Sequence, residues 1–352
     1  VLSSATVLVN TLGWGEANLI SMVMLVIIGL ILSLGKVVYK TQEYFQKWLI
    51  ILGVPFILLL TFLLSKASDW QDLAMGLVGK GDGFWWIPGG LSIMTFLGAF
   101  AYSGAGGNLN LAQSFYIREK DYGMGKYGGK ITSLLRRKTK EFPLEGKTFL
   151  VNKENLKTFG AWWKKINLEH LLVFWLTGAI TIILLSLLSF TTVYHQTGEV
   201  TGINFLFKEA TTIGNLIIPW MGRAFLLIVS LMLFSTQMSV MDATSRIASE
   251  NLVILDKKKF VPDNLPKFYF VFLWAQILLG ILIILLGFKE PWQLVGISAF
   301  LNAITMMIYT GAILWLNQTS LDKKLRPVWW RKIILVLVVL FFAGFSILTL
   351  IS

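Results

Sequence analysis

Apolar stretches long enough to cross a lipid bilayer recur along the whole chain. A membrane-spanning helix needs about 20 apolar residues. The pattern predicts eight such spans: Leu19–Leu34, Trp48–Leu64, Trp85–Gln113, Leu171–Tyr194, Ala224–Ile247, Phe268–Gly287, Leu294–Leu316 and Ile333–Ile351. Most connections are short, but residues 115–169 form a long basic stretch that predicts a solvated loop. We therefore expect an all-α integral membrane protein with one transmembrane domain over residues 1–352.

The third predicted span is interrupted by small and polar residues. Its sequence over Tyr102–Asn110 reads Tyr-Ser-Gly-Ala-Gly-Gly-Asn-Leu-Asn. Each glycine weakens a helix by about 1 kcal/mol relative to alanine, and unpaired backbone groups at membrane depth are tolerated only where they line a protein cavity. A broken helix at this depth is typical of the binding site of a secondary transporter. The alternative is an intact helix whose small residues let a neighbouring helix approach closely.

Composition narrows the chemistry of any site. The chain is 55% hydrophobic and 14% charged, and it contains no cysteine, which excludes disulfides and thiolate metal sites. Its two histidines, His170 and His195, fall near predicted span ends. A histidine-rich metal cage inside the membrane is therefore not expected.

The positive charge alternates along the chain. Of the 31 lysines and arginines, 25 follow spans one, three, five and seven, 5 follow spans two, four and six, and Arg246 lies inside span five. This asymmetry predicts a protein of the cell membrane whose basic segments, including 115–169, lie on the cytoplasmic side. Val1 and Ser352 are then expected on the outer side. The net charge of +12 is then expected to meet anionic lipid rather than nucleic acid. Because the chain opens on what reads as the tail of an apolar helix, we also expect further helices upstream.

Ionisable residues in a span usually mark function. Asp242 and Arg246 are four residues apart on span five, so they share a helix face and can pair. A structural ion pair and a proton or ion relay are both open, and Arg246 can alternatively extend towards the cytoplasmic interface. Gln237 lies deeper in the same span and is a candidate to line a polar path.

Span seven carries one polar stripe. Ser298, Asn302 and Thr305 are spaced by four and three residues, which places them on one helix face. The stripe is explained equally by helix–helix hydrogen bonds and by a pore lining.

The order of these parts resembles the Nramp family of divalent-metal transporters, which have the LeuT-type inverted-repeat fold. The run Gly98-Ala99-Phe100 and the stretch 108–114 are similar to the broken sixth helix of the family, Ser235-Thr236-Gln237 is similar to a stretch of its eighth, and Asn302 falls near an ion-binding glutamine of its tenth. The eight spans would resemble helices 4–11 of an 11-helix protein. The resemblance implies a remnant of the first repeat over 1–84, a second repeat over 85–316 and a final helix within 317–352.

The resemblance implies a secondary active transporter that moves a divalent cation, coupled to protons and without a bound cofactor. The implied substrate-binding residues are Tyr102, Ser103, Gly104, Asn108, Gln237 and Asn302, of which Tyr102, Asn108 and Asn302 would contact the metal, and Asp242 and Arg246 would serve coupling. The family's Met-Pro-His hallmark is replaced here by residues 102–107, and Ala112 stands where a histidine usually follows. Without the thioether, the remaining ligands are hard oxygens, which suit magnesium, calcium or manganese.

Two alternatives to a metal transporter remain open. Carbonyl groups near Tyr102 favour a cation, whereas free N–H groups near Asn108 favour an anion, so a carrier of an amino acid or another small carboxylate is the first alternative. The second is a non-transporting membrane scaffold. An enzyme is not expected, because Ser103 has no histidine or lysine partner at its depth. A transport site predicts that Asn108, Gln237 and Asn302 face one shared cavity.

Overall fold

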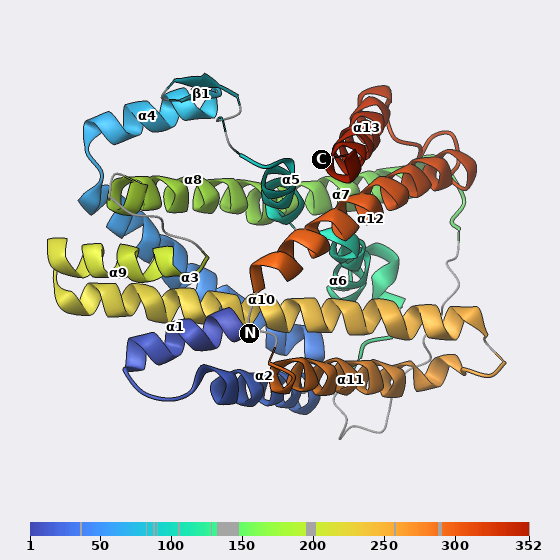
Figure 1. Cartoon of the computed structure of the whole chain (residues 1–352). Coiled ribbons are helices and arrows are strands. Elements are labelled where there is room, and N and C mark those ends of the chain that lie inside the picture. The colour runs from blue at the N-terminus through green and yellow to red at the C-terminus, as the bar shows by residue number, and fades with distance from the viewer. Residues whose placement is uncertain are drawn as a thin grey trace.

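The computed structural model describes residues 1–35, 37–81, 83–86, 89, 91–104, 106–127, 129–131, 148–194, 202–256, 258–287 and 291–351, and gives the backbone alone for residues 93–95, 108, 124, 127 and 291–296. Helices make up nearly all of this part of the chain (Figure 1). The α-helices are α1 Leu2–Leu12, α2 Ala17–Leu34, α3 Val38–Leu64, α4 Ala67–Leu77, α5 Ile93–Tyr102, α6 Gln113–Glu119, α7 Lys153–Glu169, α8 Thr177–Ser189, α9 Asn204–Leu216, α10 Pro219–Leu255, α11 Leu265–Leu285, α12 Pro291–Thr319 and α13 Trp329–Ile351.

Shorter elements connect or interrupt these helices. They are the 3₁₀ segments η1 Gly107–Ala112, η2 Gly123–Tyr127 and η5 Pro262–Asn264, the π-helical segments η3 His170–Leu176 and η4 Phe190–Tyr194, and the antiparallel strands β1 Lys80–Gly81 and β2 Phe84–Trp85. The expectation of an all-α protein therefore holds except for this small ribbon.

Among the described residues, seven helices are long and apolar enough to cross a membrane. They are Ala17–Leu34, Val38–Leu64, Lys153–Tyr194, Pro219–Leu255, Pro262–Leu285, Ile297–Thr319 and Trp329–Ile351. These match seven of the eight predicted spans, and many of their large apolar side chains are exposed, as lipid-facing residues are. The chain is a multi-pass membrane protein, and the lipid bilayer is its surroundings.

Most of the long helices run side by side, so the bundle has two ends (Figure 1). We call one the basic end: α10 and α12 finish there, α11 begins there, and it lies on the right in Figure 1. The other, the opposite end, carries the short helices α4 and α9.

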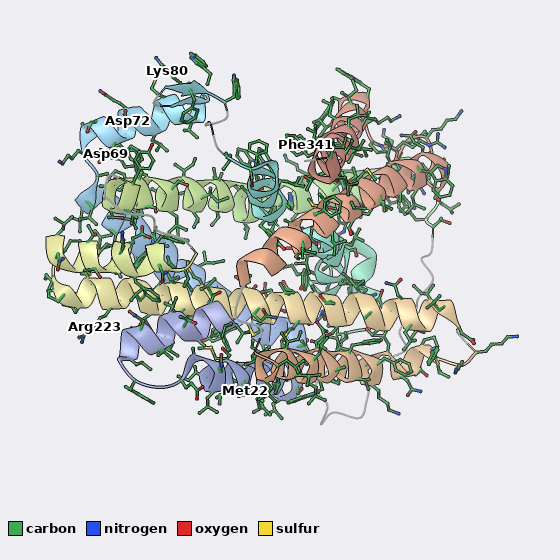
Figure 2. All side chains as sticks on the ribbon, in the orientation of Figure 1. Met22, Asp69, Asp72, Lys80, Arg223 and Phe341 are labelled. Atoms are coloured by element: carbon green, nitrogen blue, oxygen red, sulfur yellow. The ribbon has the colours of Figure 1, made fainter. Side chains whose placement is uncertain are left out.

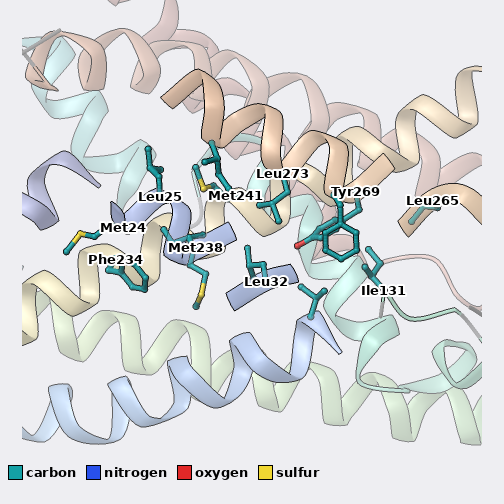
Figure 3. Packing of buried hydrophobic residues seen from close by; sticks show 14 of the residues in the cluster. Met24, Leu25, Leu32, Ile131, Phe234, Met238, Met241, Leu265, Tyr269 and Leu273 are labelled. Atoms are coloured by element: carbon teal, nitrogen blue, oxygen red, sulfur yellow. The ribbon is translucent and has the colours of Figure 1, made fainter. Parts of the chain in front are cut away.

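The main core joins helices that are distant in sequence. Side chains of α2, α10 and α11 interlock in it, and Figure 3 shows Leu32, Met238 and Leu273 among them. α2 and α11 approach closely at Gly29, because an added Cβ there would lie 2.6 Å from Ile277 Cδ1. Since lipid gives apolar helices no reason to associate, such close packing between small and large residues is what holds membrane helices together.

Two expectations about chain organisation are wrong. Span three does not begin at Trp85, because Phe84–Trp85 forms a strand and α5 begins at Ile93. The stretch 115–169 is not simply a loop, because it contains the end of α6, η2 and α7. Helix α7 starts where the Asn152 side chain accepts a 2.8 Å hydrogen bond from the Asn155 N–H, which is a favoured helix N-cap. It then continues without a break into span four.

Candidate functional site

The predicted break in span three is confirmed. Helix α5 ends at Tyr102, residues 103–104 are bends, and the chain resumes as the 3₁₀ segment η1 before α6 begins at Gln113; Ala105 lies outside the described residues. Gly107 has a φ of +57°, a conformation that costs glycine little because it has no Cβ. The glycines therefore end the helix in the way that their clustering predicts.

One wall of the break is the polar stripe of α12. The Tyr102 hydroxyl donates a 2.6 Å hydrogen bond to Ser298 Oγ, and Asn110 Nδ2 donates a 2.8 Å bond to the Tyr309 hydroxyl. Between these two bonds, Asn302 lies against Gly107, where an added Cβ would overlap its Oδ1 atom. Residues 298, 302 and 309 share one face of the helix. The predicted stripe thus meets both sides of the break, although Thr305 bonds the Leu301 carbonyl of its own helix instead.

The π-helical segment η3 also contacts the break. A Cβ added at Gly104 would lie 3.4 Å from Phe174 Cζ. His170 stacks on Phe174 with ring centroids 4.8 Å apart, and its Nδ1 lies 3.4 Å from Gln113 Nε2. π-Helical turns within α-helices occur frequently at functional sites. Sequence reasoning missed this wall, because a π-turn leaves no pattern in the apolar periodicity of span four.

The predicted substrate-binding residues are only partly brought together. Ser103 Oγ donates a 2.9 Å hydrogen bond to the Phe100 carbonyl of its own segment. Tyr102 and Gly104 are exposed at the break. Asn302 joins them through the glycines. The side chain of Asn108 lies outside the described residues, and so does His195. Gln237 is half-buried on α10 without a side-chain hydrogen bond to any described residue, so its place in a shared cavity stays a prediction.

A cluster of buried charged residues lies closer to the basic end. Arg246 Nε donates to both oxygens of Asp242 at 3.0 Å, and its Nη1 donates to Glu119 Oε1 at 2.8 Å. The Tyr269 hydroxyl donates to Asp242 Oδ1 at 2.7 Å, and the Tyr116 hydroxyl to Oδ2 at 3.2 Å. The predicted pairing of Asp242 with Arg246 is confirmed. Arg246 does not extend to the interface, because its side chain is 1% exposed.

The cluster holds more negative than positive charge. Two carboxylates, Glu119 and Asp242, surround one guanidinium, and neither carboxylate side chain is exposed. Glu119 Oε2, Arg246 Nη2 and the nearby Gln42 Oε1 have no hydrogen-bond partner among the described residues. A buried charge is costly unless it is paired and hydrogen-bonded. The cluster therefore depends on its internal hydrogen bonds and on the single guanidinium of Arg246.

Glu119 connects the cluster to the break. It is the last residue of α6, the helix that follows η1, whereas its partner Arg246 belongs to α10. Its Oε1 atom also accepts a 3.4 Å bond from the Ile131 N–H. The sequence placed Glu119 at the start of a solvated loop, between Arg118 and Lys120, so its burial could not be inferred. Any displacement of α6 must change this ion pair.

Half-buried pairs surround the cluster at the basic end. Arg118 binds Glu250 at 2.6 Å, and Lys120 pairs with Glu169. The Tyr122 hydroxyl donates a 2.7 Å bond to the same Glu169, which raises the pKa of Tyr122 to about 12. These contacts tie α6 and the turn that follows it to α7 and α10, so the second half of the broken span is held by charge on several sides.

Comparison with known proteins adds nothing to this geometry: no family model, curated protein or solved structure matches the chain. Among the described residues, no three acidic, histidine or cysteine side chains gather as a metal site would require.

Proposed function

We propose that this protein is a secondary active transporter of LeuT type, related to the Nramp family, which carries a divalent cation coupled to protons. The observation that carries the proposal is the division of span three between α5 and η1, with polar contacts to α12 on both sides. A transmembrane helix rarely sacrifices backbone hydrogen bonds unless the freed groups face a cavity. In transporters such half-helices bind the substrate.

The chemistry of the break supports a cation more than an anion. The carbonyl end of α5 lies at Tyr102 beside the amide of Asn302, whereas the chain beyond it enters η1 with Gly107 packed on the same amide. Carbonyl and amide oxygens are hard ligands that suit magnesium, calcium and manganese. Tyr102, Asn108 and Asn302 are the proposed metal contacts, and a carboxylate from elsewhere in the protein would strengthen them.

The buried cluster supports proton coupling. Asp242 and Arg246 are the proposed coupling residues, and Glu119 joins them because it shares the same guanidinium. When α6 moves with the substrate, the Glu119–Arg246 bond changes, and a buried carboxylate that loses its cationic partner needs another positive charge beside it. Cation release and proton binding would then be linked through one helix. In this proposal the basic end faces the cytoplasm and its anionic lipid.

Uptake by proteoliposomes tests the proposal. The full-length protein should take up radiolabelled manganese or magnesium when a pH gradient is imposed, and Asn302→Ala should reduce uptake at least tenfold. Asn317→Ala, on the same helix but away from the break, is the matched control and should leave uptake unchanged. Uptake of an amino-acid mixture without metal uptake would replace the substrate by the carboxylate alternative. Absence of any uptake by the correctly folded protein would favour a scaffold.

A further inference from the structure

A separate cavity lies at the opposite end of the bundle. Its volume is about 530 Å³, which falls within the range of about 300–1,000 Å³ that is usual for small-molecule sites. Helix α4 and the β1–β2 ribbon form one wall, and α8 with η4 forms the other. Most lining side chains are apolar, including Leu73, Leu77, Phe84, Leu187 and Phe190. The cavity is therefore shaped for an apolar chain rather than for water.

The cavity exists because α4 is held only near its beginning. Asp69 Oδ2 accepts a 2.8 Å bond from the Lys66 N–H and a 3.3 Å bond from Thr191 Oγ1 of η4. Trp70 packs on Phe62 of α3 with ring centroids 5.1 Å apart. No residue of α4 is buried, although the helix lies beside α8. Since folded interiors are otherwise close-packed, the space between α4 and α8 calls for an occupant.

Two opposite charges line this cavity without a partner among the described residues. Asp72 on α4 and Lys80 on β1 both belong to its wall, and Figure 2 shows them following Asp69 along the same edge of the molecule. Neither side chain forms an ion pair or hydrogen bond with any described residue. The adjacent Trp85 and Trp86 are 65% and 75% exposed, as tryptophans are where a protein meets lipid headgroups.

We propose that this cavity binds one zwitterionic phospholipid of the surrounding membrane. An acyl chain lies between α4 and α8, the phosphate is bound by Lys80, and the headgroup nitrogen is bound by Asp72. Charge complementarity selects this class, because a zwitterionic headgroup satisfies both unpaired side chains. An anionic headgroup would pair with Lys80 and leave Asp72 repelled, and an uncharged lipid would satisfy neither. The site is independent of the break and of any transported substrate.

Native mass spectrometry of the detergent-purified protein tests the headgroup. The protein is given equal amounts of phosphatidylethanolamine, phosphatidylcholine and phosphatidylglycerol with identical chains. It should retain either zwitterionic lipid in preference to phosphatidylglycerol. Asp72→Asn with Lys80→Gln should reduce that preference roughly fivefold, as expected for loss of the one partly exposed ion pair, at Asp72, that distinguishes the two headgroups. Glu16→Gln with Arg223→Gln, a matched acid and base at the same end, should not. An unchanged preference in the first double variant overturns the proposal.

A filling variant tests the location of the chain. Gly76 lines the cavity, and an added Cβ there meets nothing within 4 Å. The Gly76→Phe variant should therefore fold normally, occupy part of the cavity and lower retention of all three lipids. Gly178→Phe on α8, where an added Cβ also meets nothing within 4 Å, lies outside the lining and should retain lipid like the parent protein. Equal lipid retention by the Gly76→Phe and Gly178→Phe variants would overturn the proposed location of the lipid.

Discussion

Gly107 holds the break in a backbone conformation that other residues rarely adopt. Its φ is +57° and an added Cβ would overlap Asn302 Oδ1, so Gly107→Ala should combine backbone strain of about 1–3 kcal/mol with displacement of the amide. We expect a lower melting temperature and loss of uptake. Gly98→Ala is the control, because Gly98 lies within α5 and an added Cβ there would make an ordinary 3.8 Å contact with Ala299. Equal effects of the two variants would contradict the assigned role of the break.

Glu209 is expected to make the stability of the protein depend on pH. It lies on α9, is 2% exposed, and has Thr192 as its hydrogen-bond partner while Oε1 has none among the described residues. Burial raises its pKa from 4.5 to about 8. Between these two values the folded protein holds a proton that the unfolded chain has released, so stability should fall as pH rises from about 4.5 to 8, by at most about 1.4 kcal/mol per pH unit.

Thermal unfolding in detergent between pH 5 and pH 9 measures this dependence. Glu209→Gln should remove most of the slope, because glutamine does not titrate. Glu16→Gln, a change at an exposed position of the same end, should keep it. A slope that survives in Glu209→Gln would assign the effect to another group.

At the scale of elements, the buried cluster fixes α6 to α10. Arg246→Met leaves Glu119 and Asp242 buried without a cation, and breaking a buried pair in this way costs about 3–5 kcal/mol. Glu119→Gln should cost far less, because glutamine still accepts from Arg246 and the cluster loses its excess negative charge. Unfolding of both variants in detergent compares the costs. Equal losses would show that the excess charge is already neutralised in the folded protein.

Elements determined by their own local sequence could be predicted, whereas contacts made by tertiary packing could not. Spans of uninterrupted apolar residues, such as α11 and α13, were predicted well because length and hydropathy alone determine them. The break was predictable because glycine acts through its own backbone. The Asp242–Arg246 pair was predictable from its spacing, whereas Glu119 and Tyr269 join it only through tertiary packing. The contacts of η3 with Gly104 depend on a local change of helical repeat that the sequence does not signal.

At the scale of the whole molecule, orientation is open to a direct test. The chain has no cysteine, so each introduced cysteine is the only thiol that can be labelled. We expect Glu16→Cys, at the opposite end, to react with a membrane-impermeant maleimide in intact cells. Ser320→Cys, between α12 and α13 at the basic end, should react only after the membrane is permeabilised. The reverse pattern would invert the proposed topology.

The continuous helix from Lys153 to Tyr194 gives the molecule a mechanical lever. Its 42 residues span about 63 Å, twice the hydrocarbon thickness of about 30 Å, so α7 projects beyond the membrane. The helix passes the break at η3, and Arg331 of α13 contacts α7 beyond it: the guanidinium carbon lies 5.0 Å from the centre of the Trp163 ring, and Nη2 donates a 3.1 Å hydrogen bond to Asn167 Oδ1. A tilt of about 10° would move the tip of a 17-residue arm by roughly 4 Å. Small rearrangements around the break would thus be amplified into displacements large enough to be sensed at the surface of the membrane.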